Sequence, residues 1–340
     1  MKTITRFAAG ITAGTILLSM TACGDDKKIL ESTKEDQTVV MTVAGHDVPL
    51  EIYRYIALNY KRTYESGQTQ DIWLGESGAA LIEELNTDVE ESIVNLYATL
   101  VMCEEYGINA DDAYITDSLD ITMDAIYEEY DYDYETYAGA IAQYSMNDSV
   151  YRFIMRNELL ADELLNAMIE RGEILADEAS LQAVFDSGEF IRVKQILIAS
   201  DNGKTDEENL ARANELLDMV NGGADFDTLV QDYGEDLFMF NNHDGYYFAR
   251  GSFYPEFEDA AFSLDVGEVS GVIKTTAGYS ILKRYEKDSA YIEENFTELG
   301  NDYIDGCYNM AVEAYAETLT VTATDNLKNY SIFNLADTEE

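Results

Sequence analysis

The periodicity of apolar residues changes near residue 188, and this change limits the possible folds more than anything else in the chain. From about residue 40 to residue 187, apolar side chains recur mostly at helical spacing, in stretches that end at glycines such as Gly107 and Gly172. The segment FIRVKQILIAS, which begins at Phe190, is instead rich in β-branched residues and predicts a strand. The chain is therefore expected to be α+β, with a helical region before a mixed one.

The helical region is expected to begin with a strand, because TVVMTVAGHDVPL alternates and then turns at Gly45. Helices are predicted over residues 50–64, 79–106, 111–130, 134–144, 147–171 and 178–186. The stretch IYEEYDYDYETY, residues 126–137, alternates tyrosine with acidic residues. Two interpretations are open for it: helix ends with buried tyrosines, or an exposed aromatic patch that binds unfolded clients.

The mixed region has the predicted order β-α-α-β-α-β-β over about 100 residues. Helices are expected over DEENLARANELLDMVNGG and ADFDTLVQDYG, and DGYYFARG is typical of a strand and a turn. In GSFYPEFEDAAF, Pro255 suits the first position of a third helix, where its missing N–H costs nothing. VGEVSGVIKTTAGYSILKRYEK then predicts two strands around a glycine-containing turn. Such a segment is expected to pack helices on a small antiparallel sheet.

The amino terminus has the layout of a secretory signal. Two basic residues precede an uncharged apolar run over residues 7–20, which is short for a membrane span. The run leads into the sequence MTAC, which ends at Cys23 and resembles a bacterial lipobox. The resemblance implies cleavage before Cys23 and a lipid on its thiol, and an ordinary signal with an incidental cysteine is the alternative. Residues 1–22 are thus expected to be a lipoprotein signal peptide, and the polar residues 23–38 a flexible tether.

The chain is strongly acidic, because 67 Asp and Glu against 21 Lys and Arg give a formal net charge of −46. Such a surface repels nucleic acids and anionic lipid, so we expect no nucleic-acid partner and attachment to a membrane through lipid. Besides Cys23 the chain has only Cys103 and Cys307, which we expect to be separate buried thiols rather than a disulfide. With two histidines and no metal-ligand spacing, neither a metal site nor a cofactor is expected.

Residues 190–287 resemble a parvulin-type peptidyl-prolyl isomerase domain. The resemblance rests on four phrases in order and at the spacing of the family: QILI, NGGADFDTLVQDYGED, GSFYPEFEDAAFSLDVGEVSGVIKT and GYSILK. With a secretory signal and helical regions on both sides, the chain also resembles PrsA-type extracellular foldases, and it is similar in plan to SurA chaperones. The resemblance implies a parvulin domain at residues 188–288, inserted between residues 39–187 and 289–340 of a discontinuous helical chaperone domain.

The tail is expected to complete this chaperone domain. Residues 291–318 are predicted to be helical, and LTVTATDN is typical of a closing strand. Val39–Val43 and Thr318–Thr322 both have strand composition without a partner nearby in sequence, and an unpaired strand leaves its backbone groups exposed as an edge. We therefore expect the tail to fold onto the first segment, which would put Cys103 and Cys307 in one domain.

In the parvulin family, the phrase equivalent to GSFYPEFEDAAF carries a Phe and a Met that form the floor of the pocket for a substrate proline. Carried over to this chain, Phe257 matches the Phe and Phe253 stands where Met is usual, whereas Phe262 is expected to be a core residue. Tyr246, where the family usually has Gly, and Phe248 complete the expected substrate-binding set. The alternative is that Phe257 is also simply a core residue.

The polar residues depart from the family pattern. Gln195 in QILI and Ser280 in GYSIL stand where parvulins usually have histidines, whereas Asp236 and Thr275 match an acidic or thiol position and a threonine of the family. The resemblance implies that these four residues form the catalytic group. Gln and Ser can form a hydrogen bond with each other, but neither takes up a proton near neutral pH. The domain is therefore expected to be either a slow isomerase or a module that only binds peptide.

The resemblance implies an enzyme that catalyses cis-trans isomerisation of X-Pro bonds. It also implies a foldase that is lipid-anchored to the outer face of a bacterial cell membrane and whose partners are unfolded or partly folded exported proteins. The competing interpretation is a holdase chaperone whose parvulin domain is weak or inactive. A solute-binding lipoprotein is disfavoured, because residues 190–287 leave no room for a two-lobed α/β plan. A homodimer is left open as an assembly state.

Overall fold

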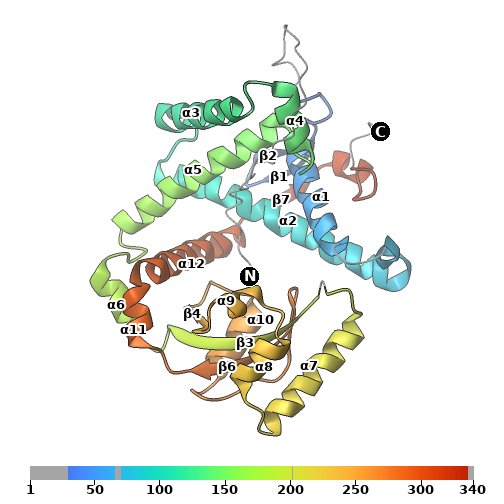
Figure 1. Cartoon of the computed structure of the whole chain (residues 1–340). Helices are drawn as coiled ribbons and strands as arrows, with labels where there is room; N and C mark the ends of the chain where they lie inside the picture. Colours follow the sequence, from blue (N-terminus) through green and yellow to red (C-terminus); the bar gives the residue numbers. More distant parts are fainter. Residues whose placement is uncertain (1–29, 66–69, 201, 336–340) are drawn as a thin grey trace. The chain divides into compact units, whose positions relative to one another are not determined.

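The computed structural model of the chain describes residues 30–65, 70–200 and 202–335. The expected signal peptide and the cysteine expected to carry lipid, Cys23, lie outside these residues. In the described part of the chain, no helix is both long and apolar enough to cross a membrane. The architecture is α+β, as expected, and combines many helices with small antiparallel sheets (Figure 1).

The described residues fall into two compact units. Residues 30–170 and 311–335 form one, which we call the helical unit, and residues 171–310 form the other, which we call the mixed unit. Helix α12 (Phe296–Ala316) contributes to both, because the division falls within its last two turns. The domain boundaries that the sequence suggests at residues 188 and 288 stay a prediction.

The helical unit joins a small sheet to long helices (Figure 1). Besides the end of α12, its elements are β1 (Val39–Val43), β2 (His46–Pro49), α1 (Leu50–Glu65), η2 (Gln70–Trp73), α2 (Gly75–Tyr106), α3 (Ala113–Glu129), α4 (Tyr134–Ala142), α5 (Asp148–Glu170), β7 (Val321–Ala323) and η3 (Asp325–Asn329). The helices expected in this region are present, but α2 begins at Gly75 rather than at Ala79. Gly75 is the first residue of the helix and has a φ of 73°, a turn conformation that glycine adopts without strain. The helix therefore begins at this turn.

Strand β7 brings the tail back to the start of the helical unit. The sheet has the order β2-β1-β7, and β1 pairs antiparallel with both neighbours. Thr42 lies opposite Asp47 of β2 and opposite Thr322 of β7. The Thr324 hydroxyl extends the contact by donating to Val39 O at 2.9 Å. The expected pairing of these two distant segments is confirmed, but the tail strand is Val321–Ala323 rather than Thr318–Thr322, and β1 also has a partner nearby in sequence, β2.

The segment expected to be a flexible tether is instead held in place from Ser32 onward. Asp36 is 9% exposed and accepts hydrogen bonds from the Thr33 hydroxyl at 2.7 Å and from Arg54 of α1 at 2.6 Å. Ser32 donates to the buried Glu51 carboxylate at 2.6 Å. The polar residues of this stretch therefore form hydrogen bonds with buried groups of the protein rather than with water. Their polar composition alone predicts a flexible segment.

Two tyrosines of the acidic, tyrosine-rich stretch are buried. The hydroxyls of Tyr127 and Tyr137 both donate to Asp148 Oδ1 of α5, at 2.5 and 3.1 Å. Burial, together with the bond to Asp148, raises the pKa of Tyr127 to about 12. Tyr132, by contrast, is exposed. The structure supports the interpretation with buried tyrosines for Tyr127 and Tyr137, whereas Tyr130 and Tyr134 are half-buried.

The mixed unit places helices on both faces of an antiparallel sheet with the order β4-β3-β6-β5 (Figure 1). Its elements are α6 (Glu178–Asp186), β3 (Ile191–Ala199), α7 (Asp206–Asn221), α8 (Phe226–Tyr233), α9 (Leu237–Asn241), β4 (Tyr246–Phe248), α10 (Pro255–Ser263), β5 (Ile273–Thr275), β6 (Gly278–Tyr285), α11 (Ser289–Glu294) and most of α12. The expected strands and helices are present. Helix α9 is an addition, because a five-residue apolar run is too short to show helical periodicity.

Alternation along the central strand β3 sends its side chains to opposite faces of the sheet. On one face, Ile196 belongs to a core cluster with Leu216 of α7. On the other face, Val193 belongs to a core cluster with Phe257 of α10. Gln195 follows Val193 by two residues and therefore lies on the face that α10 covers.

The cysteines of the described residues are free thiols, as expected. Cys103 of α2 is fully buried and donates to Leu160 O at 3.4 Å, and burial raises the pKa of its thiol to about 12. Cys307 of α12 is only half-buried and falls in the mixed unit. Cys103 lies in the helical unit, and the division inside α12 follows Cys307 by only a few residues, so the expectation that both cysteines share one domain stays a prediction.

Replacing Thr322 by proline should destabilise the helical unit. Thr324 N–H donates to Val40 O at 2.9 Å, and donors alternate along an antiparallel ladder, so Thr322 N–H also points toward β1. Proline removes this donor, and Thr322→Pro should lower the free energy of unfolding by about 1–3 kcal/mol. Ala323→Pro is the matched control, because its N–H points away from β1. Urea denaturation of both variants checks the prediction, and equal losses would contradict the pairing.

Candidate active site

Four polar side chains of the mixed unit form one hydrogen-bonded network on the α10 face of the sheet. Gln195 Nε2 donates to Asp236 Oδ2 at 2.6 Å, and Gln195 Oε1 accepts from Ser280 Oγ at 2.9 Å. The Tyr246 hydroxyl donates to the same Asp236 oxygen at 2.8 Å. Gln195, Asp236 and Ser280 are 7%, 9% and 2% exposed. We call these four residues the polar network, and it is largely shielded from water.

Strand pairing and a helix cap hold the polar network in place. Ser280 of β6 lies opposite Leu197 of β3, so Ser280 and Gln195 are diagonal neighbours on one face of the sheet. Asp236 caps α9, because its Oδ1 accepts the Phe238 N–H at 2.9 Å. Its other oxygen serves the network. One carboxylate thus fixes both the start of α9 and the centre of the network.

The network offers hydrogen bonds but no imidazole. Burial, and then the adjacent Asp236 carboxylate, raise the pKa of Tyr246 above its ordinary value near 10, so its hydroxyl stays protonated. The histidines of the chain are His46 and His243. His46 lies in the helical unit, and His243 is exposed with its Nδ1 3.2 Å from Gln231 Nε2. A histidine that transfers protons within the network is therefore excluded.

Aromatic rings form a floor next to the polar network. Phe253 stacks on Phe257 with ring centroids 4.7 Å apart, and it meets Phe248 at 4.6 Å and Tyr246 at 4.9 Å. Phe257 is 3% exposed, whereas Phe253 is half-buried. We call these four rings the aromatic floor. Tyr246 belongs to both groups, through its ring to the floor and through its hydroxyl to the network.

A buried carboxylate holds the loop that carries Phe253. Glu258 is 5% exposed, and its Oε1 accepts the backbone N–H groups of Gly251, Ser252 and Phe253 at 2.8, 2.8 and 2.9 Å. Gly251 has a φ of 95°, and a Cβ there would lie 2.7 Å from Gly306 O, so this position requires glycine. The loop is therefore fixed from both sides, and the Phe253 ring with it.

The structure brings seven of the expected site residues together: Gln195, Asp236, Ser280, Tyr246, Phe248, Phe253 and Phe257. Thr275 is not bonded to the network. It is buried at the turn between β5 and β6, where its hydroxyl accepts Ala277 N–H at 3.2 Å. Phe262 is partly buried against Phe248, with ring centroids 5.7 Å apart, as expected for a core residue.

The expected site lacked Phe238 of α9. Its ring stacks on Tyr246, with centroids 4.4 Å apart and planes 9° apart, and it is 42% exposed. The available signal was the run LFMF directly after Asp236, because consecutive apolar residues in an acidic surface stretch suggest a contact site. The run was too short to be assigned to an element.

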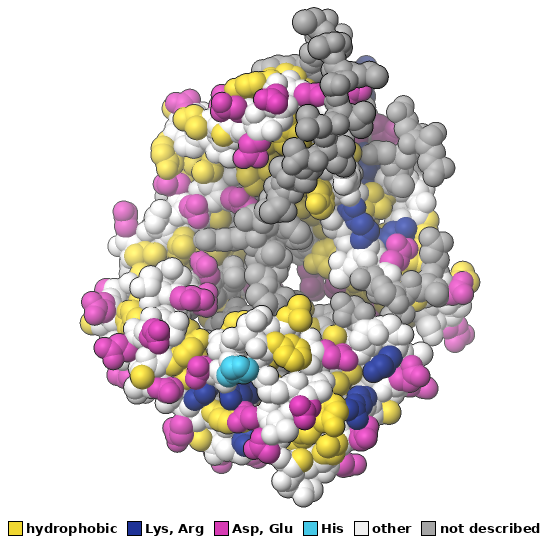
Figure 2. Space-filling model, in the orientation of Figure 1, with side chains coloured by type: hydrophobic (Ala, Val, Ile, Leu, Met, Phe, Trp, Pro, Cys, Tyr) yellow, Lys and Arg dark blue, Asp and Glu magenta, His cyan; other side chains and the backbone are white. Residues whose placement is uncertain are grey.

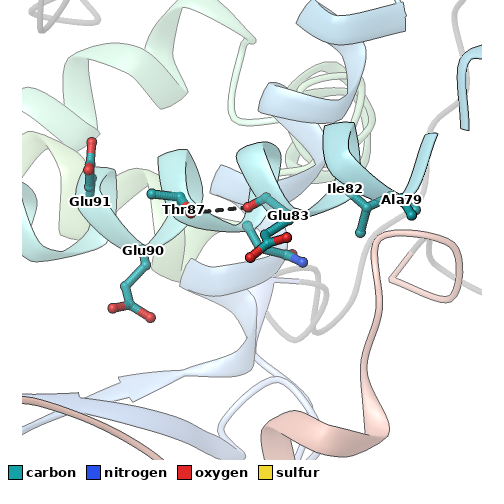
Figure 3. Close-up of a pocket in the computed structure, with 7 residues that line it drawn as sticks. Ala79, Ile82, Glu83, Thr87, Glu90 and Glu91 are labelled. Carbon is teal, nitrogen blue, oxygen red and sulfur yellow. Dashed lines mark hydrogen bonds between the residues drawn. The ribbon is translucent and has the colours of Figure 1, made fainter. Parts of the chain in front are cut away.

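The described residues of the helical unit line hollows as well. A shallow one along α2 is lined by Ala79, Ile82, Glu83, Asn86, Thr87, Glu90 and Glu91 (Figure 3). The Thr87 hydroxyl there donates to the Glu83 carbonyl at 3.1 Å. A larger hollow of about 840 Å³ mixes aromatic and charged residues, among them Tyr97, Phe153 and Arg152. In the part of the chain that the structure describes, no cluster of three or more His, Cys, Asp or Glu could hold a metal ion.

Glu258→Gln should loosen the loop before α10. The glutamine amide supplies a weaker acceptor and turns an NH₂ group toward backbone donors, so the free energy of unfolding should fall by about 1–3 kcal/mol. Amide hydrogen exchange should also quicken at Ser252 and Phe253. Glu256→Gln is the control, because Glu256 is exposed on the same helix. Unchanged protection of the loop in Glu258→Gln would contradict this role.

Residues 180–288 match the family of PPIC-type PPIase domains. The foldase protein PrsA of Caldanaerobacter subterraneus subsp. tengcongensis is 29% identical over 290 residues, which cover 83% of this chain and 82% of that protein. The foldase protein PrsA of Halalkalibacterium halodurans is 32% identical over 136 residues, which cover 40% of this chain and 39% of that protein. Among solved structures, the foldase protein PrsA of Streptococcus pneumoniae has 21% identity and a TM-score of 0.35, and the match covers 71% of this chain and 86% of that one.

Proposed function

We propose that this PrsA-like chain, which carries a parvulin-type peptidyl-prolyl isomerase domain, binds unfolded exported proteins and catalyses rotation about their X-Pro bonds at the polar network. The isomerase class follows from the match over residues 180–288, and similarity to a foldase extends over 83% of the chain. The observation that supports the site is the meeting of an apolar floor and a buried polar group at one residue, Tyr246.

The reaction needs no nucleophile and no net proton transfer. Rotation about an X-Pro bond is slow because the amide has partial double-bond character, with a barrier of roughly 20 kcal/mol. An enzyme lowers this barrier by binding the twisted amide more tightly than the planar one. The aromatic floor would hold the proline ring, and the polar network would offer hydrogen bonds to the adjoining peptide groups. Such bonds are stronger in a site that excludes water.

An amide replaces imidazole at the centre of this site. Gln195 is oriented at both ends, because its nitrogen donates to Asp236 and its oxygen accepts from Ser280. This arrangement supports a polar network of fixed geometry, and it supports an isomerisation rate lower than that of a site with histidines at these positions. It also favours the second candidate function, a holdase, because groups that already have partners offer less to a twisted peptide bond.

The proposed location rests on the sequence. The secretory layout of residues 1–22 and the lipobox-like sequence before Cys23 support a lipid anchor on the outer face of a bacterial cell membrane. The net charge of −46 supports the same conclusion, because the chain would be repelled from anionic lipid without a covalent anchor. Its clients would then be exported chains that emerge at this surface.

Peptide binding should depend strongly on Phe257. Phe257 is 3% exposed, so Phe257→Ala would act on a ligand mainly by removing the ring on which the half-buried Phe253 stacks at 4.7 Å, and affinity for a proline peptide should fall about tenfold, or by roughly 1.4 kcal/mol. Gln195→Ala should weaken binding less, because it removes hydrogen bonds within the protein. Phe262→Ala is the control on the same helix. NMR titration with circular dichroism as a check of folding tests this, and a folded Phe257→Ala that binds like the parent chain would show that the floor is misassigned.

The isomerisation rate of the parent chain should change little between about pH 6 and pH 8.5, because the network has no histidine and the pKa of Tyr246 is raised. Gln195→His with Ser280→His should raise the rate and introduce a pH dependence near the ordinary histidine pKa of about 6.5. Exchange NMR on a short peptide with one X-Pro bond measures both. A parent chain without activity would favour the holdase, and a parent as fast as the double variant would contradict a weakened enzyme.

A further inference from the structure

Helix α9 presents three large apolar side chains to solvent. Leu237, Phe238 and Phe240 are 76%, 42% and 44% exposed, whereas Met239 is 2% exposed and belongs to the core cluster with α7 and α8. Because successive helical residues turn by about 100°, an inward Met239 leaves the other three on the outward arc. Hydrophobic side chains are accordingly visible on the surface over α9 (Figure 2). On so acidic a chain, an apolar cluster of this kind marks a contact site.

This surface is continuous with the aromatic floor. The Phe238 ring lies on Tyr246 at 4.4 Å, Tyr246 meets Phe253 at 4.9 Å, and Phe253 stacks on Phe257 at 4.7 Å. Exposure falls along this series from 42% at Phe238 to 3% at Phe257. The rings therefore lead without interruption from the surface of α9 to the buried end of the floor.

The same contacts fix α9 relative to the network. One oxygen of Asp236 accepts the Phe238 N–H, and the other accepts hydrogen bonds from Gln195 and Tyr246. Gln231 also donates to Met239 O, at 3.4 Å. A surface that is already ordered loses little conformational freedom when a ligand binds, which favours binding of a short peptide segment.

We propose that Leu237, Phe238 and Phe240, together the α9 shelf, form a second subsite for an aromatic or large aliphatic side chain of the client, two or three residues from its proline. This inference rests on the proposed function, because it places the proline on the aromatic floor. Phe238 and Phe253 both contact Tyr246, with ring centroids 4.4 and 4.9 Å from its ring, so the separation of the two rings is within the reach of two or three extended residues at about 3.3–3.6 Å each.

The chemistry of the subsite would favour unfolded clients. Large apolar side chains are mostly buried in folded proteins and become accessible in unfolded chains. A site that requires both a proline and such a side chain at short distance therefore selects unfolded segments over surface loops. The acidic residues around the shelf would not contribute to this preference, because an uncharged side chain has no net electrostatic attraction to them.

A peptide series tests the α9 shelf. Each peptide is polar apart from one proline and carries either Phe or Ala at the second or third residue on one side of it. Affinities for the full chain without its signal are measured by isothermal titration calorimetry. We expect one of the Phe peptides to bind about three- to tenfold more tightly than its Ala counterpart, as is typical of one additional aromatic contact.

Two variants of the shelf should abolish this preference. One is Phe238→Ala, and the other combines Leu237→Ala with Phe240→Ala. The second variant keeps the ring that stacks on Tyr246, so it should change the affinity for the Ala peptide by less than about twofold. Leu210→Ala is the matched control, since Leu210 is a 40% exposed leucine on α7 of the same unit. It should leave the preference intact.

The outcomes separate this inference from the proposed function. If the parent chain shows no preference for Phe, or if the preference survives in both shelf variants, the α9 shelf is not a subsite. If Phe257→Ala binds every peptide as well as the parent, the proposed floor itself is wrong. Analytical ultracentrifugation measures the oligomeric state of the parent chain and of each variant. A dimer that only the Leu237→Ala, Phe240→Ala variant disrupts would mean that a second copy of the chain covers the shelf. This outcome would also overturn the proposal.

Discussion

The pairing of β3 with β6 is the interaction on which the mixed unit depends. The ladder runs from Arg192 opposite Tyr285 to Ala199 opposite Gly278, and it joins segments far apart in sequence. A slip of one residue in either strand would move every side chain of that strand to the other face. Gln195 would then be buried among the apolar residues under α7 and α8, without its partners. The apolar residues on both faces hold the register, and the position of the polar network follows from it.

Buried carboxylates occur in both units and stabilise each of them in the same way. In a chain with 67 acidic and 21 basic residues, cations cannot neutralise each of them. Glu51 accepts from Ser32, Gln37, Asn147 and Ser149, and Glu258 accepts from three backbone N–H groups. Asp236 is served in the same way by an amide, a phenol and a backbone N–H. Neutral donors thus compensate for the loss of water, and each such carboxylate ties together segments that would otherwise be separate.

Much of this architecture could be predicted from local signals. Gly107 ends α2 in the left-handed conformation, and Pro255 begins α10, as their residue types indicate. The network and floor residues were predicted by family resemblance, because their contacts join distant segments. Three features were out of reach for physical reasons. Helix α9 is shorter than two turns, the Thr275 hydroxyl could equally serve a turn or a site, and the order around Asp36 depends on polar contacts that apolar periodicity does not record.

The position of β7 in the chain has a consequence for the order of events during biosynthesis. A polypeptide appears from its amino end, so β1 and β2 exist long before residues 321–323 do, and the entire mixed unit is made in between. The mixed unit can begin to fold while the sheet of the helical unit still lacks one strand. Throughout that interval one edge of β1 presents unpaired backbone groups. The nascent chain can thus misassociate through the free edge of β1, its first strand in the sheet, until β7 has been made and has paired with it.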